Sequence, residues 1–309
     1  MKVVDGPWMD WSPVAEPAAI TVGVLDGVHR GHRTLLERLT TDGLVPTVVT
    51  FEPHPVEVLS PGVPPRLITT IDERIELLDS LGVSMVAVLD LAEIRDLAPE
   101  EFVSEVLVGR LGAKRIVAGV DFQFGKNRAG SIAMLWSQAD ELGFVVDVVD
   151  LVVSNGTVSS SRIRGLIESQ RVAEAAELLG ARYRLTSQVV AGDKRGRAIG
   201  FPTANLVPPQ RKVIPGDGVY AAYARVGGKV HRAAVNVGVR PTFGGGDRLI
   251  EAYLIDFDGD LYGEQLTVEF VENLRDELRF ESTDELVARM DHDIVETRAI
   301  LESTPSNMS

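Results

Sequence analysis

Gly23-Val24-Leu25-Asp26-Gly27-Val28-His29-Arg30-Gly31-His32 stands between the apolar run Ile20–Val24 and a helical pattern at Arg33–Thr40. A strand that turns directly into a helix is typical of a parallel sheet, and such a turn lies at the carboxyl edge, where open α/β folds usually bind nucleotides. Glycines at 27 and 31 let the backbone approach a ligand closely, and the helix start offers unpaired N–H groups to phosphate. The stretch therefore predicts an α/β domain with a nucleotide site at this turn.

The alternation of strand and helix continues to about Asp150. Short β-branched runs predict strands, and apolar residues at spacings of three and four predict the helices that cover the sheet. The expected strands are Ile20–Val24, Thr47–Phe51, Met85–Leu89, Arg115–Val120 and Phe144–Val149. The expected helices are Arg33–Thr40, Asp72–Leu81, Pro99–Leu111 and Ile132–Leu142, followed by a pair at Ser161–Ser169 and Val172–Leu179.

The pattern changes after Arg182, where strands follow one another without helices between them. Such an order indicates an antiparallel barrel or sandwich. The expected strands are Arg184–Val190, Gly218–Val226, Val230–Val237, Leu249–Phe257 and Gln265–Glu272, and a helix at Thr283–Leu301 follows them. We therefore expect two domains, residues 1–182 and 183–309, which also suits a chain of 309 residues.

Composition narrows the class of protein. The chain has no cysteine, so it can form neither a disulfide nor a thiolate zinc site, and we expect a cytoplasmic protein. No window reaches the roughly 18 uninterrupted apolar residues of a membrane span, so we expect no membrane partner. The net charge of −14 argues against nucleic-acid binding, because that affinity comes mainly from cationic side chains.

His29 and His32 are the first candidate catalytic residues. At a helix start beside Gly27 and Gly31 they could donate hydrogen bonds to phosphoryl oxygens, and such bonds strengthen as charge develops in the transition state. Two other interpretations stay open: the pair could ligate a metal, or both imidazoles could merely cap the helix. A P-loop is excluded, because Gly119–Lys126 is one residue too long and Asn127 stands where Ser or Thr is required.

A second glycine-rich segment lies in the other half. Gly192, Gly196 and Gly200 would let the backbone fold over phosphates, and the cations Lys194, Arg195 and Arg197 would neutralise them. A solvated basic turn is the competing interpretation.

Glu251 is the candidate base of this half. By strand alternation it shares a face with Tyr253 and Ile255, so we expect a partly desolvated carboxylate with a raised proton affinity, suited to accept a proton from an attacking hydroxyl. The competing interpretation is a surface Glu on an edge strand.

Several ordered motifs now resemble one family. The turn resembles the H-x-G-H signature of nucleotidyltransferases, and Pro202-Thr203-Ala204-Asn205 matches the P-T-A-N motif of riboflavin kinases. The other matching stretches are Thr50-Phe51-Glu52-Pro53-His54-Pro55, Gly119-Val120-Asp121-Phe122-Gln123-Phe124-Gly125 and Ser159-Ser160-Ser161-Arg162-Ile163-Arg164. From about Ile20 to Ala299 the chain resembles the prokaryotic bifunctional riboflavin kinase/FMN adenylyltransferase (FAD synthetase) family. The resemblance implies a Rossmann-like nucleotidyltransferase domain and a riboflavin-kinase-type antiparallel β-barrel with a closing C-terminal helix.

The resemblance also implies roles for individual residues. Thr203 and Asn205 would hold Mg²⁺ and nucleotide phosphates, and Glu251 matches the catalytic Glu of riboflavin kinases. Ser160, Ser161 and Arg164 would contact phosphate, although the hydroxyls could instead cap a helix. Gly23 and Asp26 belong to the nucleotide turn. The residues expected at the flavin are Phe51, His54, Asp121, Phe122, Phe124, Asn236 and Arg275, and the three Phe could equally be core residues.

The implied enzyme phosphorylates riboflavin to FMN and adenylylates FMN to FAD, with ATP and Mg²⁺, as a monomer or weak homo-oligomer. Val24 and Leu25 stand where the family commonly has Asn and Phe, so a riboflavin kinase with a weak or inactive adenylyltransferase domain is the alternative. A flavin carrier without catalysis is a third hypothesis, which leaves both phosphate-binding turns unexplained.

Overall fold

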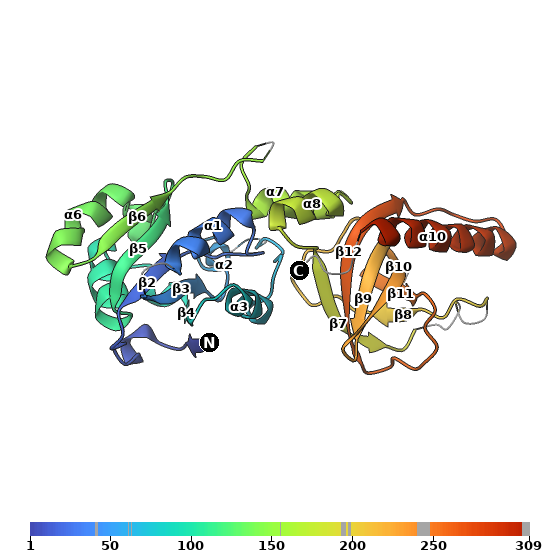
Figure 1. The fold of residues 1–309 in the computed structure, drawn as a ribbon, viewed down its shortest axis with the longest axis horizontal. Helices are drawn as coiled ribbons and strands as arrows, with labels where there is room; N and C mark the ends of the chain where they lie inside the picture. The colour runs from blue at the N-terminus through green and yellow to red at the C-terminus, as the bar shows by residue number, and fades with distance from the viewer. Residues whose placement is uncertain are drawn as a thin grey trace. The chain divides into compact units, whose positions relative to one another are not determined.

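The structure, a computed structural model, describes residues 1–40, 43–60, 62, 64–154, 156–192, 196, 199–239 and 248–304. The chain forms two compact units, Met1–Ser160 and Ser161–Ser309 (Figure 1). The expected functional boundary at residue 182 lies beyond helices α7 (Ser160–Glu168) and α8 (Val172–Leu179) and stays a prediction.

The first unit is built on a six-stranded parallel sheet. Its strand order is β1-β4-β3-β2-β5-β6, and every neighbouring pair is parallel. The strands, in spatial order, are β1 Lys2–Val4, β4 Met85–Leu89, β3 Val45–Phe51, β2 Ala18–Val22, β5 Ala113–Gly119 and β6 Val145–Val149. The expected Rossmann-like sheet is confirmed. The edge strand β1 was not expected, because three residues are too few to show an alternating pattern.

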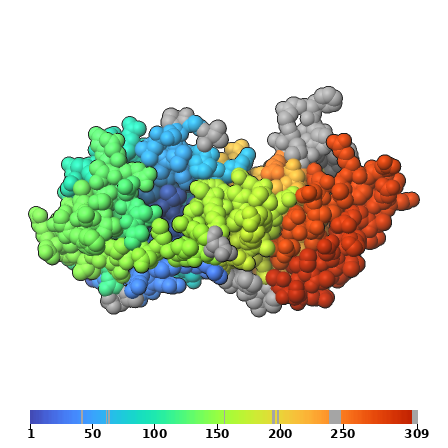
Figure 2. All heavy atoms as spheres, turned by 90° about the horizontal axis from the view of Figure 1, so that it is seen from above, coloured from blue at the N-terminus to red at the C-terminus, as the bar shows by residue number. Residues whose placement is uncertain are grey.

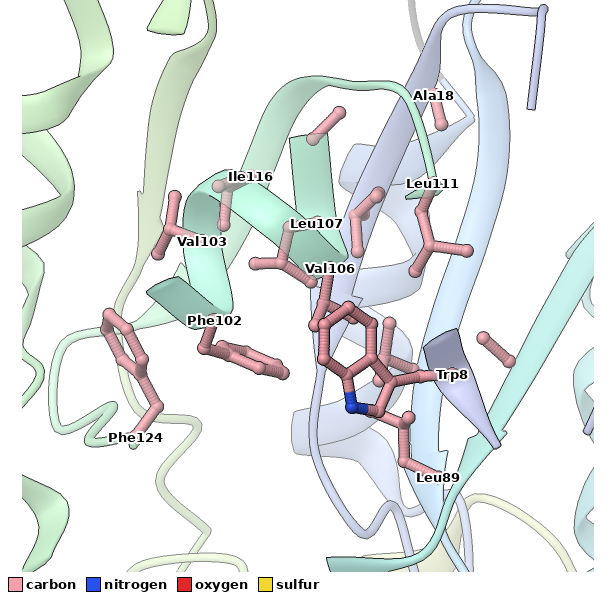
Figure 3. Close-up of a cluster of buried hydrophobic side chains, with 14 of the residues drawn as sticks. Trp8, Ala18, Leu89, Phe102, Val103, Val106, Leu107, Leu111, Ile116 and Phe124 are labelled. Carbon is pink, nitrogen blue, oxygen red and sulfur yellow. The ribbon is translucent and has the colours of Figure 1, made fainter. Parts of the chain in front are cut away.

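Helices cover both faces of this sheet. Leucines of α1 (Arg30–Leu39) and α3 (Ile71–Ser80) pack with Ala19 and Val48. The neighbours Ile20 and Val49 point the other way and pack with residues of η2 (Phe102–Arg110) and α6 (Ile132–Leu142). Figure 3 shows this second core, where Phe102 and Val106 of η2 lie near Trp8. The shorter helices of this unit are η1 Trp8–Asp10, α2 Pro55–Leu59, α4 Leu91–Ile94, α5 Pro99–Glu101 and η3 Lys126–Arg128.

The helix expected at Pro99–Leu111 is not a regular α-helix. After one turn of α5 it continues as the π-helical stretch η2, in which the Leu111 N–H reaches the Val106 carbonyl five residues back. The wider turn brings Phe102, Val103, Val106 and Leu107 to the core together.

The strand order determines where the functional turns lie. After β2 the chain adds β3 and β4 on one side, and then returns to add β5 and β6 on the other side. A ligand crevice forms outside the carboxyl ends of the strands at such a reversal. The turn after β2, which carries His29 and His32, and the loop after β5, which carries Asp121, both leave the sheet at this point.

The second unit is a closed antiparallel barrel in the order β10-β11-β8-β7-β12-β9. The strands are β7 Arg184–Val190, β8 Ala204–Leu206, β9 Gly218–Val226, β10 Lys229–Val239, β11 Arg248–Leu254 and β12 Gln265–Arg275. The helices are α7 Ser160–Glu168, α8 Val172–Leu179 and α10 Thr283–Ser303. The expected barrel with a closing C-terminal helix is confirmed, and the sandwich is not found.

Helix α10 closes the barrel from outside. Leu301 packs with Tyr223 and Val271, and the Tyr223 hydroxyl donates to the Leu301 carbonyl at 2.9 Å. Figure 2 shows the spheres of α10 (red) on the surface of this unit. Within the described part of the chain, no helix combines the length and apolar character needed to cross a bilayer.

Candidate active sites

His29 and His32 form one stacked pair at the start of α1. Their ring centroids are 3.5 Å apart, and the Nδ1 of His29 accepts a hydrogen bond from the backbone N–H of His32 at 3.4 Å. Because Nδ1 is the acceptor, a neutral His29 carries its proton on Nε2 and can donate it to a ligand. The His29 imidazole can therefore cap the helix through Nδ1 and bind a ligand through Nε2 at the same time. Among the described residues no group of three or more His, Cys, Asp or Glu side chains could hold a metal.

Both imidazoles are held neutral. Burial lowers the pKa of His29 to about 4, and a backbone hydrogen bond and the charge of Asp26 act in the opposite direction. Burial also lowers the pKa of His32 well below its ordinary value, and the electrostatic effects of His29 and Arg74 act in the same direction. At neutral pH the pair can therefore donate hydrogen bonds but carries no net positive charge.

Asp26 holds the turn from inside. It is 2% exposed, and its carboxylate accepts hydrogen bonds from the backbone N–H groups of Ile68 and Thr69 at 3.0 and 2.8 Å. The hydroxyl of Thr69 in turn accepts from the N–H of Gly27 at 3.0 Å. The structure thus gives the Asp26 carboxylate protein partners that fix the turn.

The serines predicted for phosphate contact lie at the start of α7. The hydroxyl of Ser160, the last residue of the first unit, donates to the Asp26 carbonyl at 2.9 Å. Ser161 and Arg164 follow in the same helix and belong to the second unit, and their contact with phosphate stays a prediction.

The predicted flavin residues of the first unit have different surroundings. Phe124 is a core residue, 7% exposed, whose ring lies 6.0 Å from that of Phe102 (Figure 3). Phe122 stacks on it at 5.2 Å and is half-buried, as is Phe51 at the end of β3. Asp121, in the loop after β5, is exposed. The two half-buried rings and this carboxylate are thus better placed than Phe124 to meet a ligand.

His54 has a local structural role. Its Nδ1 accepts a hydrogen bond from the Val56 N–H at 3.2 Å, and its own backbone N–H donates to the Glu57 carboxylate at 2.8 Å. It therefore caps α2, and the proton of a neutral His54 lies on Nε2.

A cavity of about 550 Å³ in the second unit brings together most of the residues predicted there. Gly200 is not among its lining residues, and Lys194 and Arg197 lie outside the described part of the chain. The predicted residues that line the cavity are Gly192, Gly196, Thr203, Asn205, Asn236, Glu251 and Arg275.

Glu251 stands in a row of polar side chains. On β11 it lies opposite Asn236 of β10 and opposite Asn205 of β8, in register. Directly opposed residues point to the same face with Cβ atoms about 5 Å apart. The alternation expected for Glu251 holds as far as Tyr253, because Ile250 and Ala252 are fully buried while Glu251 and Tyr253 are half-buried. Ile255 lies beyond the end of β11 and is buried. The row can hold a proton acceptor between two amides.

Two glycines of the second predicted phosphate-binding segment are closely packed by neighbouring residues. A Cβ atom on Gly192 would lie 2.3 Å from the Nδ2 atom of Asn205. A Cβ atom on Gly196 would lie 2.3 Å from the Phe201 carbonyl oxygen, and 3.6 Å from the Thr203 hydroxyl. Both positions therefore exclude a side chain, and the Thr203 hydroxyl and the Asn205 amide lie directly beside the glycine backbone.

Asp293 of α10 also lines the cavity and was missed in the sequence. It is 3% exposed and pairs with Arg275, whose Nη2 lies 2.7 Å from its Oδ2. A signal was present, since Asp293 falls on the apolar stripe of the helix with Leu286, Met290 and Leu301. An acid on such a stripe needs a buried partner.

The chain matches known proteins over nearly its whole length. Residues 12–162 match the family described as FAD synthetase, and residues 179–301 match the family described as riboflavin kinase. The bifunctional riboflavin kinase/FMN adenylyltransferase of Escherichia coli K12 is 36% identical over 96% of this chain and 97% of its own length. That of Bacillus subtilis is 33% identical over 89% and 90%. A crystal structure described as a macrolide-efflux protein from Streptococcus pneumoniae superposes with a TM-score of 0.90, at 33% identity, over 96% of this chain and 99% of that one.

Proposed function

The chain belongs to the family of bifunctional riboflavin kinase/FMN adenylyltransferases, and on that premise we propose how its residues carry out the two reactions. The enzyme transfers the γ-phosphoryl group of ATP to riboflavin, giving FMN and ADP. It then transfers the adenylyl group of a second ATP to FMN, giving FAD and pyrophosphate. The catalytic roles proposed for the barrel rest on one observation: Asn205, Glu251 and Asn236 form a row along its cavity.

In the kinase reaction Glu251 is the general base. It accepts the proton of the ribityl 5′-hydroxyl as that oxygen bonds to the γ-phosphorus and the bond to the β-phosphate oxygen breaks. A positioned base of this kind typically contributes about 10²-fold to 10⁴-fold in rate. Gly192 and Gly196 let the phosphates approach the backbone, and Asn236 orients the flavin side of the cavity.

The residues beside the glycines fit magnesium. Mg²⁺ prefers oxygen ligands. Thr203 presents a hydroxyl and Asn205 an amide oxygen beside the backbone of Gly196 and Gly192. These two residues would hold the ion with the nucleotide phosphates, and the ion would neutralise charge on those phosphates.

In the adenylyl transfer His29 and His32 stabilise the transition state. The FMN phosphate attacks the α-phosphorus of ATP, and the bond to the β-phosphate oxygen breaks to release pyrophosphate. Neutral imidazoles donate hydrogen bonds to the phosphoryl oxygens, and Asp26 keeps the turn in shape. Phe51, Phe122 and Asp121 face the flavin or adenine.

The alternative of an inactive adenylyltransferase domain depended on Val24 and Leu25. The main-chain carbonyl of Val24 accepts a hydrogen bond from the Thr50 hydroxyl at 2.9 Å, a contact that any side chain at position 24 permits. Leu25 is 2% exposed and packs in the core with Val28. Neither residue removes a group from the imidazole pair, and the comparisons favour the bifunctional enzyme over this alternative.

We place the enzyme in the cytoplasm as a monomer or weak homo-oligomer, with no nucleic-acid or membrane partner. The absence of cysteine and the net charge of −14 motivate this assignment. Size-exclusion chromatography with light scattering tests the oligomeric state. The resemblance to the structure described as a macrolide-efflux protein is one of fold, and no feature of the described residues points to a macrolide.

Product analysis of wild type, two variants and one control variant tests the proposal. Wild type given riboflavin and Mg·ATP is expected to accumulate FMN and FAD. The double variant His29→Ala with His32→Ala should stop at FMN, and Glu251→Gln should make no FMN yet convert supplied FMN to FAD. Glu272→Gln, an exposed glutamate on β12, is the control. Loss of both activities in a folded Glu251→Gln protein would show that the two reactions do not use separate sites.

A further inference from the structure

Arg74 is a buried cation that the two proposed reactions leave without a role. It lies on α3 and is 1% exposed. Its Nη1 donates to the Thr50 hydroxyl at 3.1 Å, its Nη2 donates to the Thr69 carbonyl at 3.4 Å, and Nη2 lies 4.0 Å from the Asp26 carboxylate. Burying a charge costs several kcal/mol unless its partners compensate. A cation kept at such a position calls for an explanation.

The partners of Arg74 lead to the catalytic turn by two routes. Thr50 accepts from Arg74 and donates its own proton to the Val24 carbonyl at 2.9 Å. On the other route, the carboxylate of Asp26 accepts from the N–H and the hydroxyl of Thr69, at 2.8 and 3.1 Å. Arg74 therefore braces the turn at its first residues and again at its middle.

The turn needs such bracing because its backbone is strained. Leu25 and Val28 adopt φ angles of 50° and 40°, and Val28 is β-branched. Non-glycine residues rarely occupy this region, and each costs of order 1–3 kcal/mol that only a well-defined surrounding structure can maintain. His29 follows Val28 directly, so relaxation of the turn would move the imidazoles.

We propose that Arg74 is a positioning residue for adenylyl transfer, because it braces the strained turn between β2 and α1 and so keeps His29 and His32 in place. The inference rests on the adenylyltransferase function proposed above. Arg74 touches neither the reacting phosphates nor the flavin in this account, and it acts through Thr50 and Asp26.

The charge of Arg74 has a second effect on the pair. It is one of the causes that lower the pKa of His32, after burial and the neighbouring His29. Other charged groups near the pair are Asp26, which opposes the pKa decrease of His29, and Glu52, which acts on Arg74. Arg30 and Arg33 adjoin the histidines in the chain, and the Nε of Arg33 donates to the Val28 carbonyl at 3.3 Å. Removal of the Arg74 charge should therefore raise the pKa of His32. If Arg74 had a purely structural role, the charge at position 74 would not affect that pKa.

Two substitutions separate geometry from charge. Arg74→Lys keeps the positive charge but loses the planar guanidinium group. Arg74→Met loses the charge and the guanidinium group, while its side chain is of similar length. Arg95→Met is the control, because Arg95 is an arginine of the same unit that is 52% exposed. FMN adenylylation is measured as kcat and KM between pH 5 and 9. The rate of riboflavin phosphorylation in the same samples shows whether the second unit is intact. NMR titration gives the pKa values of His29 and His32.

Both variants are expected to lose about 10²-fold in kcat for FAD formation, since a displacement of about 1 Å can cost that much, with phosphorylation unchanged. Only Arg74→Met should raise the histidine pKa values. In that variant the loss of adenylylation rate at acid pH should therefore begin at a higher pH than in wild type. A folded Arg74→Met protein with wild-type kcat and wild-type histidine titration overturns the inference. If Arg74→Met does not fold, Arg74→Lys decides by its kcat alone. Wild type that makes no FAD would instead refute the function, whatever the NMR titrations show.

Discussion

The carboxylate of Asp293 accepts hydrogen bonds from the Nε and Nη2 atoms of Arg275, at 3.0 and 2.7 Å, and this pair ties α10 to the end of β12. Arg289, one turn earlier in α10, also reaches the Asp293 carboxylate, at 3.0 Å. Both members of the pair line the cavity that holds Glu251. The attachment of the closing helix and the shape of the proposed kinase site therefore depend on the same contact.

Asp293→Ala should destabilise the second unit and impair phosphorylation. Breaking a largely buried ion pair leaves an uncompensated charge and typically costs about 3 kcal/mol or more. Thermal unfolding followed by circular dichroism and the rate of FMN formation are the measurements. Asp291→Ala, on the exposed side of the same helix, is the control and should change neither. Equal effects of the two substitutions would mean that stability and phosphorylation depend on the helix as a whole and not on the Asp293–Arg275 ion pair.

Gly192→Ala should lower kcat/KM for phosphorylation by about 10²-fold and leave FMN adenylylation intact. The new Cβ would lie 2.3 Å from the Asn205 amide, so Asn205 must move away from the phosphate site. Gly165→Ala is the control, because no atom lies within 4 Å of a Cβ at that position. Phosphorylation at the wild-type rate in Gly192→Ala would remove Asn205 from the proposed site.

The stability of the first unit should fall as the pH is lowered from 6.5 toward 4. His29 has a pKa of about 4 in the folded protein and an ordinary value of 6.5, so in this window the unfolded chain binds more protons. One histidine contributes at most about 1.4 kcal/mol per pH unit, and His32 acts in the same direction.

Tryptophan fluorescence measures this effect in the first unit alone, because Trp8, Trp11 and Trp136 all belong to it. Urea unfolding is compared at pH 6.5, 5.5 and 4.5. His29→Gln, which cannot titrate, should lose less stability than wild type over this range. Parallel losses in both proteins would contradict a lowered His29 pKa.

Leu25→Phe should destabilise the first unit and should not increase FAD formation. Leu25 is 2% exposed, and a larger ring in a filled core typically costs about 1–3 kcal/mol. Leu25→Met, which nearly conserves volume, is the control and should cost less. Urea unfolding and FAD formation are measured on both variants. A stable Leu25→Phe enzyme with faster FAD formation would revive the idea that the ring common in the family is functionally missing here.

Several features could be read from the sequence because they depend on local patterns. The alternation of β-branched runs and helical periods predicted the parallel sheet, and the run of strands after Arg182 predicted an antiparallel barrel or sandwich, of which the structure has the barrel. The turn at His29 and His32 was found because glycines and imidazoles adjoin in the chain. Gly192, Thr203 and Asn205 were likewise found from one continuous segment, and the structure places all three along one cavity.

Other features were decided only when distant residues met. Arg74 and Asp293 look like ordinary helix residues in the chain, and their partners Thr50 and Arg275 lie on other elements, 24 and 18 positions away. The sequence by itself determined most of the strands and helices and the glycine-rich turns between them, because backbone sterics and hydrophobic periodicity act over a few residues. The tertiary structure alone decided which charges are buried and which side chains brace the catalytic ones, because burial and ion pairing depend on what the fold brings within a few ångströms.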